Sequence, residues 1–198
     1  AYAEGAKRAP TAKPLGVLVE LGVAGGRTGL REREAALSVA RMIASTPGLK
    51  LAGIECFEGI LGDVPAVDHL LDDVVAVAVS CVKGGLFPPG GPIILSAGGS
   101  AFYDRVGERF APADLGGRPI IKLIRSGCYL THDTLGYAAA HERILRETKL
   151  KLPPGKLEAA LEVWAYVQSR PEPTKAILTM GKRDVSYDGP LPAPLHWF

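Results

Sequence analysis

The sequence has few cysteines, no strong charge of either sign and no long apolar run. Cys56, Cys81 and Cys128 are far apart and form no CxxC pair, which argues against a disulfide framework and favours reduced thiols in the cytoplasm. The net charge is +2 and no basic stripe is present, so we expect no nucleic acid as a partner. No apolar run could span a bilayer, so we expect no membrane partner either.

The composition is that of a folded globular chain, with 47% hydrophobic and 22% charged residues in a length of 198. This length has room for one large or two small domains. A polar lead from Ala1 to Pro14 runs directly into an apolar strand that needs neighbours on both sides. Because the sequence supplies few such strands, we expect the chain to be a piece of a longer protein.

Strands and helices are predicted to alternate over most of the chain, as in parallel α/β folds. The expected strands are Leu15–Val23, Leu49–Phe57, Ile93–Leu95 and Arg118–Ile124, and the expected helices are Arg31–Ala44, Val64–Leu86, Phe102–Phe110 and Tyr137–Thr148. The alternating valines of Val64–Leu86 would also suit a strand. The connection between the parallel strands Leu49–Phe57 and Ile93–Leu95 needs a crossover, usually a helix, so we predict a helix here.

The pattern changes after Leu152, where prolines and a glycine interrupt the chain. Leu157–Ser169 alternates partly between apolar and polar residues, which indicates a strand, and Ala176–Met180 is predicted to be another short strand. We therefore predict two domains, an α/β part at residues 1–148 and a β part at residues 149–198. The boundary is expected near Leu145–Leu152.

Compact polar segments follow all four predicted strands of the α/β part: GGRTG, ECFEG, SAGGS and RSGCY. In parallel α/β folds, ligands bind at the carboxyl ends of the strands. The SAGGS and SGC segments have small side chains, and SAGGS leads into a helix whose N-terminal N–H groups would attract an anion. We expect Gly99 and Gly127 to open onto one pocket that holds a phosphate. The alternative is a tight connection that binds nothing.

In this order, the motifs resemble the D-serine dehydratase/D-threonine aldolase group, which are fold-type III pyridoxal-phosphate enzymes related to alanine racemase. The resemblance rests on VLVELGV with GGRTG, GIECFEG, LSAGGSAFYD, LIRSGCYLTHD and VQSRPEPTKAILTMGKRDVSYD, between about Val17 and Leu195. It implies an α/β fold made of the later strands of a (β/α)8 TIM-type barrel, followed by the start of a C-terminal β domain.

The resemblance also implies which residues lie around the cofactor, pyridoxal 5'-phosphate. Arg27 would reach the cofactor ring, and a salt bridge to Glu20 or Glu55 is the alternative. Phe57 stands where relatives often have a tyrosine, so it keeps a stacking face but lacks the hydroxyl. The full set of expected cofactor-binding residues is Arg27, Phe57, Ser96, Gly98, Gly99, Ser100, Gly127, Cys128 and Tyr129.

Three positions have two open interpretations each. Tyr129 could line the phosphate pocket or simply pack. His132 and Asp133 fall where the family carries an aspartate, and they could either form a hydrogen-bonded pair at the barrel mouth or act in catalysis.

No catalytic residue is identified in the chain itself. The Schiff-base lysine of the family is expected upstream of Ala1, because neither Lys122 in a strand nor Lys182 in GKRD lies in the right context. The ligands of a divalent metal, zinc or manganese, are expected downstream of Phe198. His196 is expected to be a surface residue.

The resemblance implies a D-amino acid deaminase or dehydratase of the D-serine type. In that reaction, α-proton abstraction and β-elimination give a keto acid and ammonia. The alternatives are a retro-aldol lyase of the D-threonine aldolase type and a catalytically incomplete fragment that binds pyridoxal phosphate or phosphate. The expected partners are a small D-amino acid and either a second copy, in a homodimer, or the rest of the barrel.

Overall fold

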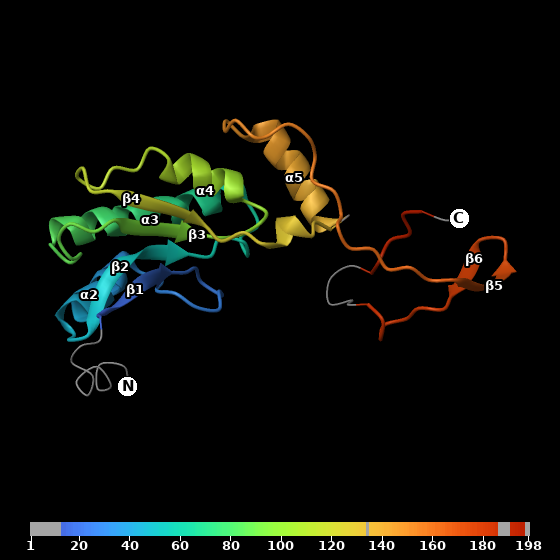
Figure 1. Cartoon of the computed structure of the whole chain (residues 1–198), viewed down its shortest axis with the longest axis horizontal. Coiled ribbons are helices and arrows are strands. Elements are labelled where there is room, and N and C mark those ends of the chain that lie inside the picture. The colour runs from blue at the N-terminus through green and yellow to red at the C-terminus, as the bar shows by residue number, and fades with distance from the viewer. Residues whose placement is uncertain (1–12, 134, 186–190, 197–198) are drawn as a thin grey trace.

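The computed structural model describes residues 13–133, 135–185 and 191–196, except for the side chain of Tyr129. Its main part is a parallel sheet with the strand order β1-β2-β3-β4, in which each strand is followed by a helix (Figure 1). The strands are β1 (Leu15–Leu21), β2 (Leu49–Cys56), β3 (Ile93–Ala97) and β4 (Ile120–Ile124). The helices are α2 (Arg33–Ser45), α3 (Val64–Lys83), α4 (Tyr103–Phe110), the short 3-10 helix η1 (Cys128–Leu130) and α5 (Gly136–Glu147).

The register of the sheet brings the carboxyl ends of its strands to one edge. Leu21 pairs with Cys56 at the ends of β1 and β2, and Ala97 pairs with Ile124 at the ends of β3 and β4. The segments that follow these strands are therefore neighbours in space, which is where parallel α/β folds bind ligands.

The ambiguous valine-rich segment is a helix, as the crossover argument predicts. Asp63 begins α3 by accepting a hydrogen bond from the N–H of Ala66 at 2.8 Å, and Pro65 lies in the first turn. Val67, Val74 and other apolar side chains of α3 are buried. A helix that covers the sheet satisfies its own backbone groups, which a fifth strand without neighbours could not do.

One hydrophobic core lies between the sheet and the helices α2, α3 and α4. Ile54 and Leu95 from the central strands and Leu71 from α3 have no exposed surface, and Phe110 of α4 is 1% exposed. The edge strand β4 differs, because Ile121, Leu123 and Ile124 are 45%, 43% and 42% exposed. No helix in the described ranges is both long and apolar enough to cross a membrane.

The C-terminal part contains an antiparallel hairpin of β5 (Val167–Glu172) and β6 (Lys175–Leu178), which lies beyond α5 and away from the sheet (Figure 1). The prediction of a strand from Leu157 is wrong, since the structure has no strand before Val167 in this region. The N–H of Ala160 donates to the carbonyl of Thr131 instead of to a neighbouring strand, and Leu161 is 74% exposed. Partial alternation is not enough where no partner strand is present. The division into domains at residue 148 stays a prediction.

Candidate functional site

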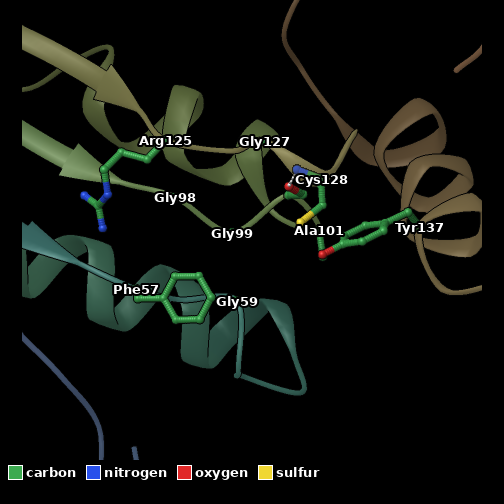
Figure 2. A pocket seen from close by; sticks show the side chains of 10 residues that line it. Phe57, Gly59, Gly98, Gly99, Ala101, Arg125, Gly127, Cys128 and Tyr137 are labelled. Carbon is green, nitrogen blue, oxygen red and sulfur yellow. Dashed lines mark hydrogen bonds between the residues drawn. The ribbon is translucent and has the colours of Figure 1, made fainter. Parts of the chain in front are cut away.

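A pocket of about 480 Å³ lies at the carboxyl ends of β2, β3 and β4 (Figure 2). Gly99 and Gly127 both line it, which confirms that the two small-residue corners open onto one cavity. The lining residues are Phe57, Gly59, Gly98, Gly99, Ser100, Ala101, Arg125, Gly127, Cys128 and Tyr137. Of the residues expected around a cofactor, the structure thus brings Phe57, Gly98, Gly99, Ser100, Gly127 and Cys128 together.

The two glycines after β3 make hydrogen bonds that the sequence did not suggest. The N–H of Gly98 donates to Oε2 of Glu58 at 3.0 Å, and the N–H of Gly99 donates to Oε1 at 2.5 Å. Glu58 is completely buried. A carboxylate of the chain itself therefore already accepts from these two N–H groups.

The same glycines allow a close approach between strand ends. A Cβ atom at Gly99 would lie 2.7 Å from Cα of Gly59, and one at Gly98 would lie 2.8 Å from Cβ of Arg125. Both distances are too short for non-bonded carbon atoms. Glycine is thus required here by contacts within the protein.

Other backbone donors are left for a ligand. The N–H groups of Ser100, Ala101 and Gly127 have no acceptor within the described residues. The N–H of Cys128 donates to Oγ of Ser100 at 3.1 Å, and the Ser100 side chain also forms a hydrogen bond with Tyr137. A Cβ atom at Gly127 would meet nothing within 4 Å, so the space beside it is open.

Arg125, which follows β4, brings a positive charge to the pocket. Its guanidinium lies 2.7 Å from the carboxylate of Glu55 and donates to Oγ of Ser96 at 2.6 Å and to the carbonyl of Cys56 at 3.0 Å. Ser96 is fully buried, so it supports Arg125 and does not line the pocket. Sequence reasoning did not single out Arg125, although the RSGCY segment contains it.

Arg27 lies beside the pocket and not in its lining. Its guanidinium carbon is 5.6 Å from the centroid of the Phe57 ring, within the range of a cation–π contact. The predicted alternative, a salt bridge from Arg27, is not found in the described residues, because Glu55 pairs with Arg125 and Glu20 accepts a hydrogen bond from Thr28 at 2.6 Å. Arg27 is thus placed to act on the pocket through Phe57.

Tyr137 is a pocket residue that sequence reasoning missed. It comes from the first turn of α5, and its ring points toward Cys128 (Figure 2). A hydrogen bond with the Cys128 side chain, followed by burial, raises the pKa of Tyr137 above its usual value. The hydroxyl of Tyr137 thus lies against Cys128 and Ser100 at the wall of the pocket. The YAAAHERIL segment predicts the helix but not which of its residues reaches the pocket.

Helix α5 is attached to the pocket wall by an ion pair. Arg143 lies 2.7 Å from the fully buried carboxylate of Asp104 and also donates to the carbonyl of Ala101 at 2.8 Å. The guanidinium of Arg143 lies over the ring of Phe102, 5.2 Å from its centroid. These contacts fix the position from which Tyr137 enters the cavity.

His132 and Asp133 do not line the pocket, and the hydrogen-bonded pair considered for them is not present. His132 is buried, and its ring lies edge-on to that of His141 with the centroids 6.0 Å apart. Asp133 accepts hydrogen bonds from the N–H groups of Leu135, Gly136 and Tyr137, so its role in the structure is to cap α5. The side chain of Tyr129 lies outside the described residues.

The pocket offers free N–H groups, a hydroxyl, an arginine and an aromatic face. This set fits a ligand that joins a phosphate to a flat ring, such as pyridoxal phosphate. None of the lining residues is a lysine. No cluster of three or more His, Cys, Asp or Glu side chains suited to a metal ion is found within the described ranges, and His196 is exposed there.

Three comparisons show which known proteins this chain is similar to. A family model described as "Putative serine dehydratase domain" matches residues 160–197. The chain is 25% identical over 181 residues to the 3-hydroxy-D-aspartate aldolase of Paracoccus denitrificans (strain Pd 1222), which covers 90% of the chain and 43% of that protein.

A solved structure, that of a D-threonine aldolase from Filomicrobium marinum, is similar with a TM-score of 0.63 and 23% identity. The similarity covers 97% of this chain and 47% of the other, so the chain spans less than half the length of both relatives. The match, together with the parallel sheet and the hairpin, confirms the predicted fold class, part of a barrel followed by a β domain.

Proposed function

We propose that this chain supplies the phosphate-binding part of a D-amino acid lyase. The chain is similar in sequence and fold to the D-serine dehydratase/D-threonine aldolase-like family of fold-type III pyridoxal-phosphate enzymes, as its motifs predict. The observation that carries this proposal is the shared pocket. Gly99, Ser100 and Gly127 from two adjacent strand ends line one cavity, with Arg125 beside them.

The phosphate of pyridoxal phosphate would be held by the N–H groups of Ser100, Ala101 and Gly127 and by the hydroxyls of Ser100 and Tyr137. Arg125 would contribute positive charge close to these donors. A phosphate dianion gains most from such charge-assisted hydrogen bonds in a partly enclosed site. Phe57 would contact the flat face of the cofactor ring, and the cation–π contact with Arg27 would hold Phe57 in place.

When bound, pyridoxal phosphate supplies an electron sink for the negative charge that develops at the substrate Cα. The residues of this chain retain and orient the cofactor and limit access of water to one side of it. Phe57 contributes no proton, since it lacks a hydroxyl. The lysine that links the cofactor covalently and the zinc or manganese ligands are expected in the parts of the protein outside this chain.

Two reactions of D-β-hydroxy amino acids are compatible with this pocket. The first is the elimination predicted from the sequence, in which a D-serine-type substrate gives a keto acid and ammonia. The second is retro-aldol cleavage, and it is favoured by two relatives, both of which are aldolases. With D-threonine as substrate, the complete protein would give 2-oxobutanoate and ammonia in the first case and glycine and acetaldehyde in the second, which product analysis distinguishes.

The phosphate site can be tested on the chain itself. Pyridoxal phosphate and pyridoxal differ only in the phosphate, so the ratio of their dissociation constants measures the contribution of the pocket. We expect pyridoxal phosphate to bind at least tenfold more tightly, the equivalent of one charge-assisted hydrogen bond of about 1.4 kcal/mol. Inorganic phosphate should compete. Equal affinity for the two compounds would remove the basis for the proposed function.

We further propose that the chain associates through the open side of its sheet, either with the rest of the barrel or in a homodimer. The support is the edge strand β4, whose apolar side chains Ile121, Leu123 and Ile124 are 42% to 45% exposed. Exposed apolar surface of this kind favours contact with another surface. We also propose a cytoplasmic location, for which the pattern of widely spaced cysteines is the support.

A further inference from the structure

Glu58 lies in the loop between β2 and α3 and belongs to the least exposed residues of the chain. Its exposed fraction is 0%, and it forms no ion pair in the described residues. A buried carboxylate is costly unless hydrogen bonds or a cation compensate for the loss of water. Here the compensation comes from the N–H groups of Gly98 and Gly99, forty residues further along the chain.

These hydrogen bonds join the loop after β2 to the turn after β3. The contact is reinforced by packing, because a Cβ atom at Gly59 would lie 3.1 Å from Cα of Gly99 and 2.8 Å from the ring of Phe57. Phe57, Glu58 and Gly59 thus hold Gly98 and Gly99 from one side. We call this set of five residues the clasp.

The clasp determines which donors a phosphate finds. Since Glu58 takes the N–H groups of Gly98 and Gly99, the next two, those of Ser100 and Ala101, are the first in the turn without an acceptor. A dianion placed against Gly98 and Gly99 would also meet the negative charge of Glu58. The carboxylate therefore favours binding at Ser100 and Ala101 and disfavours it at the two glycines.

We propose that Glu58 is the residue that positions the phosphate-binding turn of this pocket. It acts through Gly98 and Gly99 and does not touch the ligand, so it is a positioning residue. This inference rests on the proposed function, but it makes a separate prediction, namely which backbone N–H groups of the turn contact phosphate.

The wild-type chain, labelled with ¹⁵N, gives the first test by nuclear magnetic resonance. Before ligand is added, the amides of Gly98 and Gly99 should exchange slowly with solvent and those of Ser100 and Ala101 quickly. Addition of pyridoxal phosphate should shift and protect the amides of Ser100, Ala101 and Gly127. Protection that appears at Gly98 and Gly99 only when the ligand is added would overturn the proposal. This test needs no variant and so does not depend on the folding of one.

The variant Glu58→Gln gives the second test. It keeps the size of the side chain but replaces one acceptor oxygen with an NH₂ group, which cannot accept from an N–H. We expect binding of pyridoxal phosphate to weaken about tenfold, because one buried donor loses its partner and the turn shifts. Binding of pyridoxal should change less than twofold. Glu34→Gln on the exposed face of α2 is the matched control and should change neither value.

The outcomes separate the two proposals. If the wild-type chain does not prefer pyridoxal phosphate to pyridoxal, the proposed function fails. If the wild type has this preference and Glu58→Gln keeps it in full, the function stands and the positioning role of Glu58 is wrong. A smaller preference in Glu58→Gln, with circular dichroism unchanged, supports the role, since a general loss of structure would weaken both ligands alike.

Discussion

Arg125 Nη1 lies 2.7 Å from Glu55 Oε2, so an ion pair joins the ends of β4 and β2 across the intervening strand β3. The two side chains are 35% and 25% exposed. The same guanidinium also holds Ser96 at the end of β3. One side chain thus links three neighbouring strand ends at the rim of the pocket.

The two members of this pair should differ in their effect on binding. Arg125→Met removes a positive charge from the pocket, and we expect at least a tenfold loss of affinity for pyridoxal phosphate. Glu55→Gln removes only a partly exposed ion pair, worth about 1 kcal/mol or less, while Arg125 keeps its bonds to Ser96 and Cys56. Titration calorimetry of both variants would check this. A larger effect from Glu55→Gln than from Arg125→Met would show that Arg125 serves the sheet and not the ligand.

Gly99→Ala should be destabilising because its Cβ atom would be placed 2.7 Å from Cα of Gly59 and 2.9 Å from Oε1 of Glu58. We expect a loss of about 1–3 kcal/mol in the free energy of unfolding, as for other overpacked sites, together with weaker binding of pyridoxal phosphate. Urea denaturation measures the first effect. Gly62→Ala is the control, since no atom lies within 4 Å of its Cβ position. Equal stability of the two variants would contradict the close contact.

The three cysteines should react very differently with a thiol reagent. Burial, and to a lesser extent the charge of Glu58, raises the pKa of the Cys56 thiol far above its usual value, and burial raises the pKa of Cys81 to about 11. Cys128 is exposed and lines the pocket. Thiolates are the reactive species, so iodoacetamide should label Cys128 alone in the native chain, as mass spectrometry would show.

Pyridoxal phosphate should protect Cys128 from this labelling, because the ligand would fill the cavity that the thiol faces. Pyridoxal should protect it less at the same concentration. Labelling of Cys128 at the same rate with and without saturating pyridoxal phosphate would place the ligand elsewhere.

His141 should make the chain sensitive to acid. Burial, and then the charge of His132, lowers the pKa of His141 below its usual value of 6.5. The folded state therefore binds fewer protons than the unfolded state, and the stability that His141 contributes is present above pH 6.5 and is lost as the pH falls through the lowered pKa. The Nδ1 atom of His141 also shares a hydrogen bond with the hydroxyl of Tyr103 at 3.2 Å.

The prediction is a fall in melting temperature between pH 7.5 and pH 5 that His141→Gln reduces. Thermal denaturation followed by circular dichroism at both pH values would measure it. His69→Gln on the exposed surface of α3 is the control and should leave the fall unchanged. An identical fall in His141→Gln and the wild type would assign the acid sensitivity to other groups.

The fold could be predicted because its signals are local. Apolar runs such as Leu49–Cys56 and the small residues after each strand specify a parallel sheet and the edge at which its turns meet. The wrong strand at Leu157 shows the limit of this reasoning. Alternation is also local, but a strand exists only where another one pairs with it, and the hairpin forms further along the chain.

The sequence predicts where the site lies, but not which of its groups can donate hydrogen bonds to a ligand. Gly99 and Gly127 were correctly expected to share a pocket, since both follow adjacent strands. The contacts of Glu58 with the glycine turn span forty residues of the chain. Tyr137 reaches the cavity from α5, a helix that lies outside the sheet. No spacing in the sequence indicates such pairs, because they depend on how separate elements pack together.

The pair formed by Arg143 and Asp104 also restricts how this region can evolve. Asp104 has no exposed surface and depends on Arg143, which also holds the carbonyl of Ala101. Loss of either partner strands a buried charge at a cost of about 3–5 kcal/mol, a large part of the stability of a typical domain. Neutral drift at one position is therefore blocked unless the other changes with it. Residues that never meet the ligand therefore constrain the segment that carries Tyr137.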